Sequence, residues 1–178
     1  MIRRPPRSTL ARASAAADVY KRQGRGEGLD AAIAAYDDAV RRTPADAPDR
    51  ARHLNNLGTG LSDRYARAGR GEDLDAAIAA YDDAVRRTPA DAPDRAGRLN
   101  NLGNGLRDRY ARTGRDEDLD AAVAAYDDAV RRTPADAPER ARHLNNLGTG
   151  LSDRYARTGR GEDLDLSLIH ISEPTRPY

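Results

Sequence analysis

The stretch Leu74–Asp118, which reads LDAAIAAYDDAVRRTPADAPDRAGRLNNLGNGLRDRYARTGRDED, decides how the chain is organised. The same text starts, with few changes, at Leu29 and again at Leu119, so the chain repeats with a period of 45 residues. A fixed period of this size is typical of stacked repeats, in which each unit buries its apolar face against its neighbours. We therefore predict an all-α fold over residues 24–165, an α-solenoid of antiparallel helix pairs with units starting at residues 29, 74 and 119.

The two ends of the chain do not belong to the repeat. Residues 1–9 and 18–23 resemble translated sequencing adapters. One DNA string for DVYKRQ, residues 18–23, encodes on its opposite strand LSLIHI, which is the text of residues 166–171. We therefore expect residues 1–23 and 166–178 to be adapter-derived and disordered. A basic targeting peptide is the alternative at the N-terminus, but it leaves the C-terminal text unexplained.

Charge and composition change once these ends are set aside. The first 23 residues carry six basic side chains and one acidic side chain, and the last 13 residues are neutral. The net charge of +1 for the whole chain therefore becomes −4 for residues 24–165, which gives no support for nucleic-acid binding. The chain has no cysteine, so disulfides and thiolate metal sites are excluded, and no apolar run is long enough for a membrane span. We expect a cytoplasmic protein.

Each unit should hold a shorter and a longer helix. The shorter helix is predicted over Leu29–Arg42, where apolar residues recur at spacings of four, three and four before a Thr-Pro pair. The longer helix is predicted from about Pro48, which suits a first helical position, to about Ala66, with Gly69 and Gly71 as its stop. Gly58 lies inside it beside a leucine stripe, which favours a close approach of two helices.

The order of residues across the unit boundary resembles the tetratricopeptide repeat. The matching positions are Leu57, Gly58, Leu74, Ala77, Tyr81, Ala84 and Pro89, and then Leu102, Gly103, Leu119, Ala122, Tyr126, Ala129 and Pro134. The departures are leucine at Leu54 and Leu99, where a large aromatic residue is common, and a unit longer than usual. The resemblance implies a superhelix of helix pairs that binds proteins. It is nearest to long arrays of high-GC bacteria that are attached to CHAT-type peptidase or signalling domains.

Candidate binding residues follow from the asparagine pairs and from differences between the copies. The segment LNNLG also resembles kinesin-light-chain-type repeats, whose second asparagine binds the backbone of a target peptide. The copies differ at positions 52, 59 and 62, which lie on the asparagine face of the longer helix. The predicted peptide-binding residues are Asn55, Asn56, Asn100, Asn101, Asn145, Asn146, Arg52, Thr59, Asn104, Arg107, Arg142 and Thr149. Two alternatives stay open, namely drift on an exposed face and hydrogen bonding between repeats.

No residue pattern indicates catalysis, a cofactor or a metal site. His53 and His143 lack carboxylate or cysteine neighbours at ligand spacing, so we expect them to be solvated. We predict a non-enzymatic scaffold that binds a protein or peptide partner, which the arginines favour as acidic, with no nucleic-acid or membrane partner. It would be a fragment of a longer bacterial array. The alternative is a structural spacer that self-associates through uncapped ends, without a ligand groove.

Overall fold

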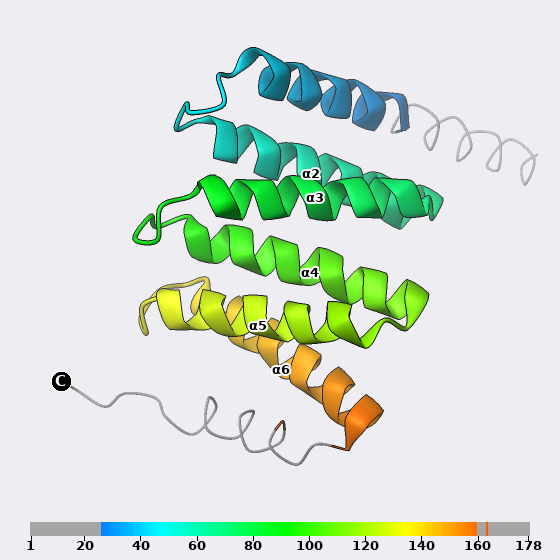
Figure 1. The fold of residues 1–178 in the computed structure, drawn as a ribbon, viewed down its shortest axis with the longest axis vertical. Helices are drawn as coiled ribbons and strands as arrows, with labels where there is room; N and C mark the ends of the chain where they lie inside the picture. Colours follow the sequence, from blue (N-terminus) through cyan, green and yellow to red (C-terminus); the bar gives the residue numbers. More distant parts are fainter. Residues whose placement is uncertain (1–25, 160–162, 164–178) are drawn as a thin grey trace, which may run out of the picture.

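The chain folds as a stack of helices, in which every described residue lies in a helix, a turn or a short connection. The computed structural model describes residues 26–159 and 163, so the expectations for residues 1–23 and 166–178 lie outside the described residues. Residues 26–42 form the first described helix. It is followed by α2 (Arg50–Ala68), α3 (Gly71–Arg87), α4 (Arg95–Thr113), α5 (Asp116–Arg132) and α6 (Arg140–Thr158). Figure 1 shows them stacked one after another, so the predicted all-α solenoid is confirmed.

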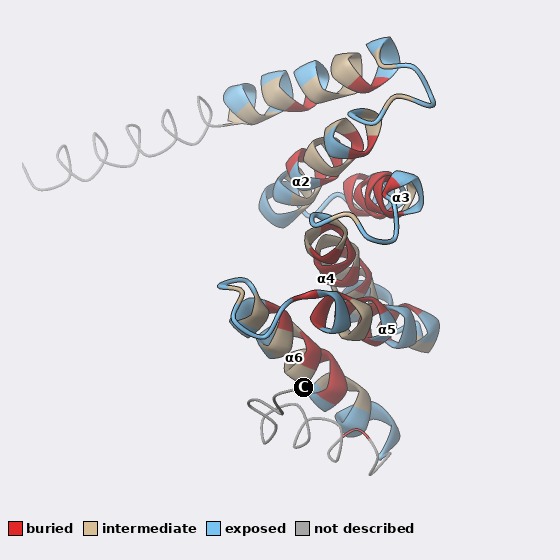
Figure 2. Cartoon of the chain, turned by 90° about the vertical axis from the view of Figure 1, so that its left-hand side faces the viewer, coloured by how far each residue is buried: buried red, intermediate tan, exposed pale blue. Residues whose placement is uncertain are grey.

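Long and short helices alternate in this stack. The long helices α2, α4 and α6 have 19 residues each, and the short helices α3 and α5 have 17. Among the described helices, α2 packs most extensively on α3 and α4 on α5, in each case the short helix that follows. Contacts across the proline-containing loops, as between α3 and α4, are less extensive. The packing unit is therefore a long helix followed by a short one. In Figure 2 the buried residues, in red, lie where neighbouring helices meet.

The predicted helix boundaries need correction at three points. The short helix of the second unit begins at Gly71, before the predicted Leu74, because acidic residues in its first turn suit a helix N-terminus. Gly71 thus starts a helix and does not end one. The long helix begins at Arg50, so Pro48 lies in the loop before it. Gly69 ends that helix as predicted, with a φ of 68° and its N–H donating to the carbonyl of Tyr65 at 2.7 Å.

Two glycines in α2, and their equivalents in α4, let the short helices on both sides come close. A Cβ atom at Gly58 would lie 2.7 Å from the ring of Tyr81 in the following short helix. A Cβ atom at Gly60 would lie 2.9 Å from the side chain of Ile33 in the preceding one. The same two contacts recur in the next unit, where they join Gly103 to Tyr126 and Gly105 to Ile78. The predicted close helix approach at Gly58 is confirmed, and the second glycine serves the opposite neighbour.

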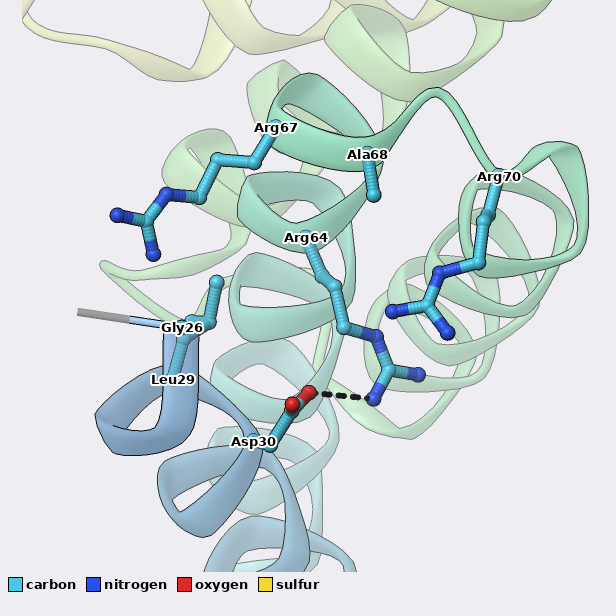
Figure 3. A pocket seen from close by; sticks show the side chains of 7 residues that line it. All are labelled: Gly26, Leu29, Asp30, Arg64, Arg67, Ala68 and Arg70. Carbon is cyan, nitrogen blue, oxygen red and sulfur yellow. Dashed lines mark hydrogen bonds and ion pairs between the residues drawn. The ribbon is translucent and has the colours of Figure 1, made fainter. Parts of the chain in front are cut away.

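An arginine in α2, and its equivalent in α4, bind the short helices before and after them. Arg64 donates two hydrogen bonds to Asp73 of α3, at 2.9 and 2.6 Å, and a third to Asp30 of the first helix at 3.1 Å (Figure 3). Asp73 is 4% exposed, and the hydrogen bonds from Arg64 lower the pKa of its carboxyl group. The same arrangement recurs for Arg109 with Asp118 and Asp75, and for Arg154 with Asp163 and Asp120. Arg64 and Arg109 therefore each join three consecutive helices.

A second arginine holds the loop between units. Arg95, at the start of α4, donates to the carbonyl of Val85 at 2.8 Å and to that of Thr88, both at the end of α3. Arg50 and Arg140 make the same contacts in their own units. The last carbonyls of a helix lack intrahelical partners, so the guanidinium satisfies them and complements the helix dipole. The residue recurs in all three copies, but its partners are backbone atoms that a side-chain pattern does not reveal.

Charged side chains run along the outer faces of the stack. In the first helix Asp37 pairs with Arg41 at 3.2 Å and Asp38 with Arg42 at 2.6 Å. None of the helices in the described part of the chain qualifies as a membrane span.

Candidate binding groove

The three long helices share one face on which a pocket crosses from unit to unit. This pocket, which we call the arginine pocket, has a volume of about 240 Å³. Its walls come from α2, from α4 with its capping residue, and from α6, namely Arg52, Asn55, Asp94, Gly97, Arg98, Asn101 and Arg142. Four of the twelve predicted binding residues, Arg52, Asn55, Asn101 and Arg142, therefore meet at one place. The predicted grouping of positions 52 and 55 on one helical face is what brings them together.

The arginines of this pocket differ in their partners. Arg98 is buried and donates to Asp94 at 2.6 Å and to the hydroxyl of Thr88, so its charge is used within the fold. Arg52 is exposed and pairs with Asp49 at 3.1 Å, a solvated contact that contributes little energy. Arg142 is exposed, forms no ion pair within residues 26–159 and 163, and has its Nη2 3.5 Å from Nε2 of His143. Arg142 is therefore the guanidinium most open to an anionic ligand.

Most of the asparagine amides bind one another between units. Asn101 donates to the side-chain oxygen of Asn55 at 3.0 Å. Asn146 donates to Asn100 at 2.8 Å and to Asn104 at 3.3 Å. Asn100 is only 1% exposed, so its side chain lies beneath the surface of the groove. These contacts match the alternative of hydrogen bonding between repeats, and two of the residues that make them, Asn55 and Asn101, also line the arginine pocket.

The other predicted residues lie further along the same face. Arg107 forms an ion pair with Asp153 of the next long helix at 3.1 Å. Asn104 accepts a hydrogen bond at 2.8 Å from Tyr126, whose pKa burial raises to about 12, so the phenol stays protonated. Thr59 and Thr149 each donate to a backbone carbonyl of their own helix, at 3.1 and 2.9 Å. Asn56 is half-buried and Asn145 is exposed.

His143 is not solvated, which corrects the prediction for this residue. It is 2% exposed, and its Nδ1 lies 2.9 Å from the hydroxyl of Thr133 at the end of α5. That hydroxyl donates to the carbonyl of Ala129 at 2.6 Å, so it accepts the proton of Nδ1, and Nε2 keeps a lone pair. Burial, followed by the charge of Arg142, lowers the pKa of His143, so the ring is neutral at physiological pH. His53, the equivalent in the first unit, is half-buried.

A further pocket, of about 440 Å³, lies at the other end of α2. Figure 3 shows three arginines around it, Arg64, Arg67 and Arg70. Arg64 already binds Asp73 and Asp30, and Arg70 lies 3.4 Å from Asp73. Because these charges are matched within the fold, this pocket is a weaker candidate for an anionic ligand than the arginine pocket.

Comparison of the chain with protein-family models and with curated proteins found no match. Among the described residues, no group of three or more histidine, aspartate or glutamate side chains is arranged to hold a metal ion.

Proposed function

We propose that the array is a non-enzymatic scaffold that binds an acidic segment of a protein or peptide along the face of its long helices. The observation that carries the proposal is the arginine pocket, which spans three units and is flanked by the exposed guanidinium groups of Arg52 and Arg142. Guanidinium groups form charge-assisted, often bidentate hydrogen bonds with carboxylates. The resemblance to the tetratricopeptide repeat supports the same function, in a bacterial cytoplasm, as the interaction arm of a longer protein.

The stacking of the units suits an extended ligand. The three equivalent long helices, α2, α4 and α6, follow one another along the stack, so equivalent side chains on their shared face recur at regular intervals. Backbone and side-chain groups also recur at regular intervals along an extended peptide. The asparagine contacts between units hold this spacing, because each joins neighbouring long helices. In the proposed complex the arginines therefore attract the acidic side chains of the partner. The hydrogen bonds between asparagines keep the long helices at a fixed spacing.

Charge reversal at the pocket tests this function. Replacing Arg142 by Glu should weaken binding of a fluorescent Gly/Ser peptide that carries several Glu residues by about tenfold or more, because a charge-assisted hydrogen bond is lost and a repulsion is added. The double change with Arg52→Glu should weaken it further. Binding is measured by fluorescence anisotropy at low salt, since exposed charges are screened.

Arg86→Glu is the matched control for this experiment. Arg86 is 66% exposed, pairs with Asp82 at 2.6 Å and does not line the arginine pocket, so its reversal changes net charge equally without touching that pocket. Equal weakening by Arg86→Glu and Arg142→Glu would mean that the peptide binds through overall charge and not at the groove.

The structural spacer is a second candidate, favoured by the asparagine contacts. Replacing Asn100 by Ala should lower the free energy of unfolding by about 1–3 kcal/mol, because the amide of Asn146 loses a buried acceptor, although Ala is the better helix former. Thermal or urea unfolding measures this, with Asn145→Ala, at an exposed position, as the control. A large loss of stability from Asn100→Ala, with no acidic peptide bound by the unchanged protein, would favour the spacer over the binding scaffold.

A further inference from the structure

Gly97 is an unusual residue for its position. The other two units carry arginine there, as Arg52 and Arg142. A Cβ atom at Gly97 would meet no other atom within 4 Å, whereas one at Gly103 in the same helix would lie 2.6 Å from Tyr126. Close packing therefore does not require Gly97, although glycine is a poorer helix former than alanine. The missing side chain leaves open space on the groove face.

That open space joins the arginine pocket to a larger one. The second pocket, which we call the loop pocket, has a volume of about 610 Å³ and lies between the α3–α4 loop and the α5–α6 loop. Asp94, Gly97 and Arg142 line both pockets, so Gly97 stands at their boundary. The volume of the loop pocket is within the range of small-ligand sites. An arginine at position 97, as in the other units, would project into this boundary.

The two pockets differ in chemistry. The walls of the loop pocket include the apolar residues Pro93, Ala96, Pro134 and Ala137. His143 forms another part of the wall and is neutral at physiological pH. Asp91, Asp94 and Glu139 line it together with Arg132 and Arg142, so charges of both signs surround it. An uncharged apolar side chain enters it without the cost of leaving a charge of its own unpaired.

We propose that the partner presents an acidic side chain to the arginine pocket and a neighbouring apolar side chain to the loop pocket, with its backbone crossing the helix at Gly97. This specificity rests on the proposed binding function and refines it. The glycine lets the chain of the partner approach the helix, and the arginines on either side fix which of its side chains is acidic. The unit with Gly97 then sets the register of the bound segment, since Gly97 lines the loop pocket.

The test uses the full chain and Gly/Ser peptides that carry Glu together with Leu at varied separations. At the best separation, Leu should tighten binding by about tenfold relative to Ser at the same position, because an apolar side chain leaves water. Gly97→Arg should remove this advantage, and Gly97→Ala should retain it. Both variants should melt at or above the temperature of the parent, since no atom lies near the added Cβ and both residues are better helix formers.

The outcomes separate the two proposals. If Leu peptides bind no better than Ser peptides, or if Gly97→Arg keeps the advantage of Leu, the loop pocket is not the specificity site, while groove binding stands. If Lys in place of Leu binds better, the acidic rim and not the apolar wall selects the partner, and the inference is overturned. If no acidic peptide binds at all, the proposed function itself fails.

Discussion

Replacing Gly103 by Ala should lower the free energy of unfolding by about 2 kcal/mol, although Ala is the better helix former by about 1 kcal/mol. The added Cβ would lie 2.6 Å from the ring of Tyr126, which is fully buried and also bound through its hydroxyl to Asn104. The ring can move only by disturbing the α4–α5 contact and that hydrogen bond. Urea unfolding monitored by circular dichroism measures the effect.

Gly148→Ala is the matched control for this prediction. Gly148 occupies the equivalent position in α6, within the same Leu-Gly-x-Gly-Leu text, but a Cβ there would meet nothing within 4 Å. This variant should gain up to about 1 kcal/mol from helix propensity. Equal effects of the two substitutions, in either direction, would contradict the role given to close helix packing at Gly103.

Protonation of the Asp73 carboxylate should contribute to the unfolding of the protein at low pH. Hydrogen bonds from Arg64 lower the pKa of this carboxyl group from its ordinary value of 3.8. A carboxyl group whose pKa is lowered on folding adds stability that is fully present above its unfolded pKa and is lost as pH falls through its folded pKa. The melting temperature should therefore fall as pH decreases below about 3.8. Thermal melts over that pH range test this.

Asp73→Asn should remove this part of the acid response and lower stability already at neutral pH. The free energy of unfolding should fall by about 3 kcal/mol, because Arg64 loses its partner in a largely buried ion pair. The contact of Arg64 with Asp30 remains and limits the loss. Asp75→Asn in the same helix is the control. Asp75 is half exposed and lies 3.4 Å from Arg109, so its loss should cost well under 1 kcal/mol. Similar costs at both positions would show that burial does not strengthen the pair.

The candidate groove was predictable in part. The helical period places Arg52 and Asn55 on one face, and both do line the arginine pocket. The period does not reveal that Asn101 reaches Asn55 of the neighbouring unit, because that contact depends on the distance between two helices. Periodicity also does not predict that His143 is buried, because the sequence RHLNN is the same around His53, which is half-buried. Residues with the same local sequence therefore pack against different neighbours in different units.

The sequence by itself determined the all-α class, the 45-residue unit, the alternation of short and long helices and the need for close contact at Gly58, because these follow from periodicity, helix breakers and residue size. Tertiary structure alone decided which polar groups pair across units, such as Arg64 with both Asp30 and Asp73. It also decided that the space at Gly97 connects two pockets. Such features depend on how neighbouring helices are placed, and side chains distant in sequence meet only after the units have stacked.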